Sequence, residues 1–211
     1  YLERALIEVG EDGAIERVIA HDDPDQTAAL AKAREAGTLY ELGEGRFGLP
    51  GFVDIHIHSP QWPQAALALD EPLYRWLDER TFPLESKFAD VDFAKEVYSD
   101  LVDQLLARGS TTAVYLGSAH LEATVALAEI CAERGQRALV GKTVMDDPAA
   151  NPDYYRDASP DQAVCDTETL IREVEAIGRK SRAGAWPVIT PRFIPRCTDE
   201  VLRGLGNLAE S

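Results

Sequence analysis

The sequence is poor in cysteine and has no long apolar run. Its three cysteines, Cys131, Cys165 and Cys197, are widely spaced and form no C-x-x-C pair. They predict reduced thiols, and they exclude both a disulfide framework and a zinc site built on paired cysteines. No stretch of 18 or more apolar residues occurs, and the chain has no basic-then-apolar start. We therefore expect no membrane-spanning helix and no secretory signal.

Basic residues are also scarce. The chain has 21 Lys and Arg against 37 Asp and Glu, which gives a net charge of -16 and a pI near 4.6. A phosphate backbone or an anionic membrane needs a basic face, so we expect neither nucleic acid nor membrane as a partner. The 45% hydrophobic and 27% charged content is typical of a soluble globular protein. We expect a cytoplasmic protein with a small-molecule ligand.

Residues 1–50 are expected to form part of a small β-rich, sandwich-like domain. Apolar and polar residues alternate on both sides of a turn at 11–13, which predicts a hairpin within residues 3–20. A helix is expected from Asp22 to Ala36, because Gly37 is a typical helix end. An extended piece at 38–42 then leads into a glycine-rich stretch.

From residue 51 onward, strands alternate with helices. Short apolar or β-branched runs predict strands at 52–57, 111–116, 137–142 and 187–190. Helical periodicity follows them at about 91–107, 120–134, 167–180 and 198–209. Four such units in series predict an α/β fold with a parallel sheet, either open and doubly wound or closed as a (β/α)8 TIM-like barrel. The glycine-rich dinucleotide fingerprint is missing after the first strand. In a barrel, residues 51–211 would be the first four of its eight βα units.

Two of the four histidines lie at the end of the first of these strands. In the run 49–58, which reads LPGFVDIHIH, Asp54, His56 and His58 share one face of the strand because side chains alternate. Two imidazoles on one face form half of a metal site, although a strand-end histidine can also be a satisfied polar residue. Asp54 is one layer deeper and is expected to orient a neighbour.

An ordered set of motifs resembles the amidohydrolase superfamily and, within it, the guanine deaminases. The small β unit and the run 50–58 resemble the superfamily. The narrower resemblance rests on HSPQW (58–62), WL (76–77), TFPLE (81–85), FAD (88–90), GSTTA (109–113), GQRA (135–138), GK (141–142), MD (145–146) and TPRF (190–193). It extends from about Leu49 to Ala209. Members of this family bind one zinc ion and convert guanine and water to xanthine and ammonia, a step of purine catabolism and salvage.

The resemblance implies roles for five residues. His56 and His58 match the first two zinc ligands, and Gln61, Arg192 and Phe193 match the guanine contacts. A flat base suits this set, because a phenylalanine offers a stacking face and an arginine fork offers donors. The family also implies a homodimer. Its remaining zinc ligands and its proton-transferring carboxylates match no residue of the chain, so the catalytic residues are unknown and we expect a longer native protein with a C-terminal half.

Other interpretations stay open for each of these residues. Gln61 could be an ordinary loop residue, Arg192 a surface arginine paired with an acidic neighbour, and Phe193 a core residue. Lys142 is expected to be structural or ion-paired. The same histidine pair would serve another deaminase of the superfamily, acting on an aminopyrimidine, a triazine or an oxidised purine. A non-catalytic homologue that keeps the fold is the third reading.

Overall fold

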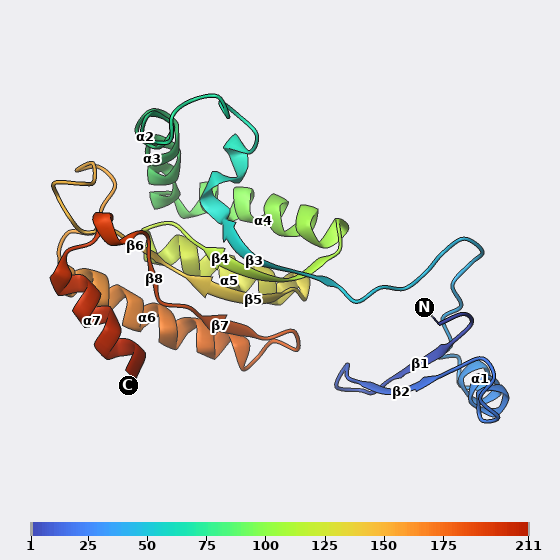
Figure 1. Cartoon of the computed structure of the whole chain (residues 1–211). Helices are drawn as coiled ribbons and strands as arrows, with labels where there is room; N and C mark the ends of the chain where they lie inside the picture. Colours follow the sequence, from blue (N-terminus) through green and yellow to red (C-terminus); the bar gives the residue numbers. More distant parts are fainter. Residues whose placement is uncertain (1, 211) are drawn as a thin grey trace. The chain divides into compact units, whose positions relative to one another are not determined.

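The first unit of the chain is a hairpin with one helix. The computed structural model describes residues 2–210 and divides the chain into two compact units, Tyr1–Pro50 and Gly51–Ser211 (Figure 1). In the first unit, β1 (Leu6–Val9) pairs antiparallel with β2 (Ile15–Ile19), and α1 spans Gln26–Glu35. The predicted hairpin is confirmed, and the predicted helix is present but begins at Gln26 and not at Asp22. The extended piece at 38–42 forms no strand, so within residues 2–50 a second sheet of a sandwich is not seen.

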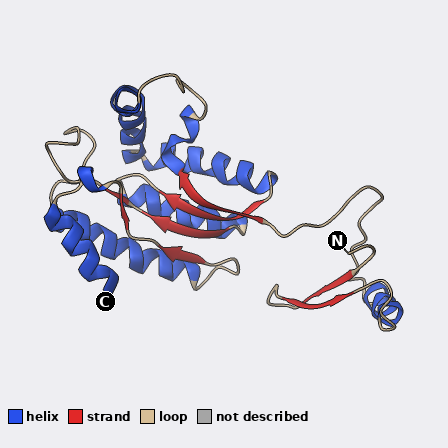
Figure 2. Cartoon of the chain, in the orientation of Figure 1, coloured by secondary structure: helices blue, strands red, loops and turns tan. Residues whose placement is uncertain are grey.

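The second unit is built on a parallel sheet in chain order. Its strands follow one another as β3-β4-β5-β7, and each pairs parallel with the next. Figure 2 shows them side by side among the helices that connect them. These elements are β3 (Phe52–His58), α4 (Val91–Ala107), β4 (Ser110–Leu116), α5 (Leu121–Arg134), β5 (Arg137–Gly141), α6 (Pro160–Gly178), β7 (Ala185–Pro187) and α7 (Asp199–Glu210).

Neighbouring helices of this unit pack against one another, α4 on α5 and α5 on α6, so they cover the same face of the sheet. An open doubly wound sheet carries helices on both faces and changes direction at a switch point. The described strands keep chain order without such a switch point, and their helices form one layer. The α/β class and the parallel sheet predicted from the sequence are therefore confirmed.

The local signals at the helix ends explain these bounds. The Asp90 side chain caps α4 by accepting from the backbone N–H of Asp92 at 3.0 Å and of Phe93 at 3.3 Å. Gly135 ends α5 with a φ of 74°, a left-handed conformation that glycine adopts without strain. The largest error in a predicted helix bound is at the start of α6. Helix α6 begins seven residues before the predicted 167, where Ser159 caps it ahead of Pro160.

The fourth predicted strand, 187–190, divides into two pieces. Strand β7 pairs with β5, whereas β8 (Thr190–Pro191) pairs with the short strand β6 (Thr143–Val144) beyond the end of β5. The intervening Val188 and Ile189 belong to neither strand. This second ladder lies beyond the carboxyl end of β5, and Arg192 follows it directly.

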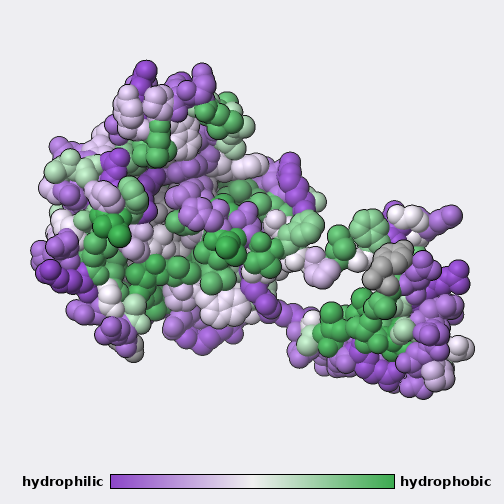
Figure 3. Space-filling model, viewed as in Figure 1, coloured by the Kyte–Doolittle hydropathy of each residue, from purple (hydrophilic) through white to green (hydrophobic). Residues whose placement is uncertain are grey.

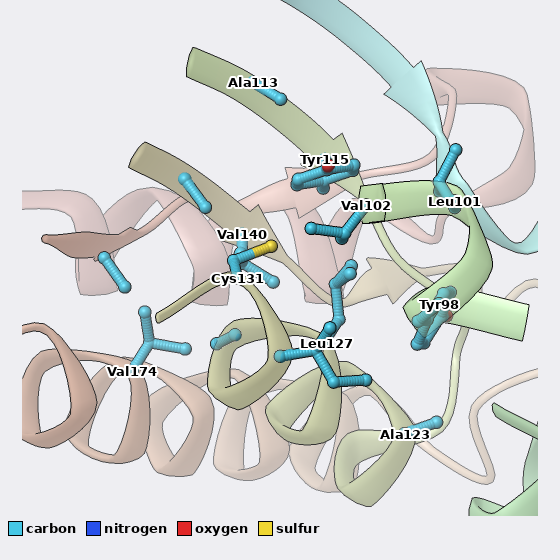
Figure 4. Packing of buried hydrophobic residues seen from close by; sticks show 14 of the residues in the cluster. Tyr98, Leu101, Val102, Ala113, Tyr115, Ala123, Leu127, Cys131, Val140 and Val174 are labelled. Carbon is cyan, nitrogen blue, oxygen red and sulfur yellow. The ribbon is translucent and has the colours of Figure 1, made fainter. Parts of the chain in front are cut away.

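The core lies between the sheet and its helices. Figure 4 shows Tyr98 and Val102 of α4, Tyr115 of β4 and Leu127 of α5 converging in it. All four are fully buried. Burying one such side chain stabilises the fold by about 1.5–3 kcal/mol. The hydroxyl of Tyr115 donates to Gln136 Oε1 at 2.6 Å, so its polar end is satisfied inside the core.

Apolar side chains of β3 are exposed on the second unit. Val53 and Ile55, on the strand face opposite to the histidines, are 62% and 73% exposed, and Phe52 is 57% exposed. Figure 3 shows hydrophobic surface over the region where Figure 1 places β3. Ile57, further along the same face, packs against the core. The sheet is thus covered by helices at the carboxyl end of β3 and less covered at its start.

Gly141, at the end of β5, lies in close contact with residues 188–190. A side chain at Gly141 would overlap the Thr190 hydroxyl and the Val188 carbonyl oxygen. We expect Gly141→Ala to lower the free energy of unfolding by about 3 kcal/mol, because the overlap can be relieved only by moving β8. Urea unfolding measures this. Gly206→Ala is the matched control: the position lies in α7 with nothing within 4 Å, so alanine should stabilise by about 0.5–1 kcal/mol. Equal effects at both positions would contradict the argument.

Candidate functional site

The two histidines at the end of β3 face each other. Nε2 of His56 and Nε2 of His58 are 3.2 Å apart, and the backbone N–H of His56 donates to Asp54 Oδ1 at 3.1 Å. Two nitrogens bound at about 2.0–2.1 Å to one tetrahedral ion lie about 3.3 Å apart, so the pair has the spacing that a shared zinc ion requires. Within residues 2–210, no three His, Cys, Asp or Glu side chains gather into a metal-binding cluster.

The environment of His58 favours its neutral form. Burial lowers the pKa of His58, the positive charge of Arg192 lowers it further, and the Glu85 carboxylate opposes this only in part. A metal ligand must be the neutral imidazole, so a lowered pKa suits ligation at neutral pH. Gln61, three residues after His58, donates to Glu85, so the Glu85–Arg192 pair lies beside the segment that directly follows the histidines.

Arg192 reaches the site because β8 ends directly before it. The backbone N–H of Arg192 donates to the Val144 carbonyl at 2.9 Å, which continues the β6–β8 ladder by one residue. Its side chain is only 8% exposed. The guanidinium lies over the ring of Phe82, 5.0 Å from the centroid, and its Nη1 is 3.9 Å from the Met145 sulfur. The Phe82 ring thus supports one face of the Arg192 guanidinium.

A buried carboxylate joins the predicted base-binding residues. Glu85 accepts two hydrogen bonds from Arg192, one from Nη1 to Oε2 and one from Nη2 to Oε1 at 3.1 Å. Gln61 also donates to it, from Nε2 to Oε1 at 2.8 Å. Burial acts to lower the pKa of Arg192, but the hydrogen bonds and charge of Glu85 outweigh it and raise that pKa. Arg192 is therefore a permanent cation in a buried setting.

Gln61 and Glu85 come from the long connection between β3 and α4. Gln61 lies in the 3-10 helix η1 (Ser59–Gln64) directly after the histidines. The continuous helical run that follows comprises α2 (Leu73–Trp76), the π-turn η2 (Leu77–Thr81), α3 (Phe82–Glu85) and the 3-10 turn η3 (Ser86–Ala89). Phe82 and Glu85 are three residues apart, so they share the face of α3 that Arg192 contacts.

Phe193 is separate from this network. It is 63% exposed, which excludes the interpretation as a core residue. It precedes the 3-10 turn η4 (Ile194–Arg196) in extended conformation. The structure therefore places His56, His58, Gln61 and Arg192 at the carboxyl edge of the sheet, with Phe193 beside Arg192 in sequence and its ring free.

The sequence analysis missed Glu85 and Phe82 as site residues. Both lie in the motif at 81–85, but neither was given a role in base binding. The sequence signal that could have identified Glu85 is its position at the end of the apolar segment Phe-Pro-Leu, because a carboxylate that is buried there needs a charged or hydrogen-bonding partner. The partner is 107 residues away, and sequence spacing does not reveal it.

A second buried ion pair lies beside the site. Lys142, placed directly after β5, has its Nζ 2.5 Å from Asp157 Oδ1, and the two side chains are 0% and 3% exposed. Asp157 Oδ2 also accepts from the Met145 N–H at 2.8 Å. The prediction that Lys142 is ion-paired is confirmed. The pair fixes the loop after β6, which carries Met145 against Arg192.

We expect Asp157→Asn to lower the free energy of unfolding by about 3–5 kcal/mol. The change leaves the Lys142 ammonium buried without a countercharge, and this costs more than the pair itself contributed. Urea unfolding of the two proteins gives the difference. Asp153→Asn is the matched control, because Asp153 pairs with Arg156 at 3.1 Å on the surface with its own side chain 91% exposed. An Asp157→Asn protein as stable as the control would contradict the expectation.

The fold and the site define the class of the protein. Parallel strands in chain order, with paired histidines and a buried arginine at their carboxyl edge, are typical of α/β proteins that bind a ligand at that edge. The chain belongs to the amidohydrolase family, whose sequence pattern matches residues 47–211.

Several curated proteins and solved structures are similar to the chain. The chain is 38% identical over 99% of its length to a guanine deaminase of Dictyostelium discoideum, of which it covers 46%. It is 41% identical over 82% of its length to a probable guanine deaminase of Schizosaccharomyces pombe, of which it covers 32%. The crystal structure of guanine deaminase from C. acetobutylicum with bound guanine matches with a TM-score of 0.83 and 31% identity, over 99% of this chain and 46% of that one. The chain thus spans less than half of the length of these relatives.

Proposed function

We propose that the protein containing this chain deaminates guanine to xanthine and ammonia with a zinc ion. The observation that carries the proposal is the contact network in which Glu85 holds both Gln61 and Arg192 beside the histidine pair. Relatives named as guanine deaminases and a similar structure with guanine bound support the choice of substrate. The protein would act as a metal-dependent aminohydrolase of purine catabolism or salvage.

His56 and His58 would supply two of the zinc ligands. A catalytic zinc takes three protein ligands and one open position, so further ligands beyond those gathered in residues 2–210 are required. When bound, zinc supplies the activation of water at neutral pH. The burial that lowers the pKa of His58 keeps this ligand neutral and available.

Gln61, Arg192 and Phe193 would hold the base. The partly buried amide and the buried guanidinium are hydrogen-bonding groups held in place by Glu85, and a site of this kind rejects ligands that leave such groups unpaired. The exposed ring of Phe193 offers a face on which a purine could stack. These side chains bind and orient the base, and the groups that move protons would come from outside the described residues.

We also propose a domain organisation, an oligomeric state and a location for the protein. Residues 1–50 would be part of a small β-rich domain, and residues 51–211 the first four units of a (β/α)8 barrel, consistent with the matched family segment. No helix among residues 2–210 is long and apolar enough to cross a bilayer. We propose a homodimer in the cytoplasm with no nucleic-acid partner, the last in keeping with the net charge of -16. Light scattering after size exclusion tests the dimer.

Guanine turnover in the complete, zinc-loaded protein tests the activity. We expect equimolar xanthine and ammonia, loss of activity after chelation, and recovery when zinc is returned. Turnover of an aminopyrimidine, a triazine or an oxidised purine in preference to guanine would favour a different deaminase of the family. Guanine binding in a calorimeter with no turnover would favour a non-catalytic homologue.

A further inference from the structure

The Glu85 carboxylate is the meeting point of the two side chains proposed to bind the base. The residue is 1% exposed, and both of its oxygens are used. Oε1 accepts from Gln61 and Arg192, and Oε2 accepts from Arg192. Nothing in the proposed reaction requires Glu85 to touch the base.

The hydrogen bonds to Glu85 occupy some of the polar atoms of Gln61 and Arg192, and only the remaining atoms can bind a ligand. An ionised carboxylate only accepts hydrogen bonds, and a guanidinium only donates them. The Gln61 amide can do both, so its Nε2 must turn toward Glu85 and its Oε1 remains free. Arg192 uses one hydrogen on each of Nη1 and Nη2 for Glu85, and its second Nη1 hydrogen faces the Met145 sulfur, so one hydrogen on Nε and one on Nη2 remain. The Phe82 ring beneath the guanidinium fixes the plane in which they point.

We propose that Glu85 is a positioning residue that sets the hydrogen-bond polarity of the base site, so that Gln61 presents an acceptor and Arg192 presents donors only. This polarity selects a 6-oxopurine edge over a 6-aminopurine edge. The inference rests on the proposed function, because it specifies how that site would recognise its base.

The two edges differ in the direction of their hydrogen bonds. Guanine has a carbonyl acceptor at C6 beside a ring N–H donor at N1. In 2,6-diaminopurine the ring and the 2-amino group are the same, but C6 carries an amino donor and N1 is an unprotonated acceptor. A site with fixed polarity pairs with one edge and sets donor against donor or acceptor against acceptor on the other. Leaving such buried groups unpaired is the strongest form of discrimination that a binding site has.

The test compares guanine with 2,6-diaminopurine in the complete, zinc-loaded protein. The readout is the discrimination ratio, defined as the Ki of 2,6-diaminopurine divided by the KM of guanine. We expect a ratio of about 100 or more in the unchanged protein. In Glu85→Gln the ratio should fall below about 10, because a glutamine at 85 can donate to Gln61 and allow its amide to turn over. Guanine KM should rise more than kcat falls.

Glu85→Asp separates polarity from simple packing. Aspartate is shorter by one methylene but is still an acceptor only, so guanine KM should rise while the ratio stays near that of the unchanged protein. Glu71→Gln is the matched control. Glu71 accepts from Arg80 at 2.8 Å with both side chains partly exposed on the same connecting segment, and it contacts neither Gln61 nor Arg192. Its ratio and KM should not change.

Three outcomes would overturn the proposal. They are a ratio near 1 in the unchanged protein, a ratio in Glu85→Gln that stays at the unchanged value, or a ratio in Glu85→Asp that falls as far as in Glu85→Gln. If thermal unfolding shows that Glu85→Gln does not fold, a ratio near 1 in the unchanged protein or a ratio below about 10 in Glu85→Asp would still overturn the proposal. An unchanged protein that does not deaminate guanine contradicts the proposed function itself. A protein that deaminates guanine with a ratio indifferent to Glu85→Gln contradicts only the role of Glu85.

Discussion

His58→Ala is expected to remove bound zinc and to reduce guanine turnover by more than about a thousandfold. His56 and His58 are the two paired ligands that the described residues offer, with their Nε2 atoms 3.2 Å apart. A single imidazole from β3 cannot replace the pair, and the metal would lose both affinity and its position relative to Arg192. Elemental analysis of the purified protein measures the zinc, and ammonia release measures the turnover.

The histidine of the first unit provides the control. His21 lies in the unit Tyr1–Pro50, where its ring is 3.3 Å from Gln26 Oε1, and His21→Ala should keep both zinc and activity. The lowered pKa of His58 also predicts the pH dependence of zinc binding: protons should displace zinc from His58 at a more acidic pH than from a histidine with an ordinary pKa. Full zinc content in His58→Ala would contradict the assignment of this residue as a ligand.

Arg192→Lys is expected to reduce kcat/KM for guanine by about 100- to 10,000-fold. Lysine keeps the charge but loses the planar fork, so it cannot hold both oxygens of Glu85 and still direct donors at the base. Two charge-assisted hydrogen bonds, each contributing about 1.5–3 kcal/mol, give this range. Steady-state kinetics with guanine measures it, and most of the change should lie in KM.

Arg80→Lys is the matched control for this substitution. Arg80 binds Glu71 through both Nε and Nη2, as a fork on a carboxylate, but the pair is partly exposed and lies apart from the site network. Its kinetics should match those of the unchanged protein. If Arg192→Lys also matched the unchanged protein, the arginine would be a structural ion pair and no part of base recognition.

The sequence predicted the parts of the site that depend on local pattern. The alternation of 52–58 was sufficient to place His56 and His58 on one face, because period-two geometry is a property of any strand. The bounds of α4 were predicted to the residue, because Asp90 and Gly109 are local signals. Where tertiary pairing decides, prediction was poorer: β8 separated from β7 because Thr190 and Pro191 pair with a different strand, β6.

The ion pair at the centre of the site could not be predicted in this way. Glu85 and Arg192 become neighbours only because the three further strands of the four-stranded sheet, together with β6 and β8, lie between them in the sequence and fold beside β3. The residue types alone allowed Arg192 to be a surface arginine with an acidic partner. In the structure Arg192 does have an acidic partner, Glu85, but both side chains are buried, and Glu85 also accepts from the partly buried Gln61.

The span of that ion pair affects how substitutions elsewhere in the sheet should be understood. Glu85 and Arg192 are 107 positions apart, and β4, β5 and β7 lie between them. A small change in the spacing of those strands moves one partner relative to the other, although neither residue has been altered. Weakened substrate binding in a variant is therefore no proof that the altered residue lies near the substrate. A substitution that disturbs the packing of α5 in the core would therefore be expected to shift the Arg192 guanidinium away from Glu85.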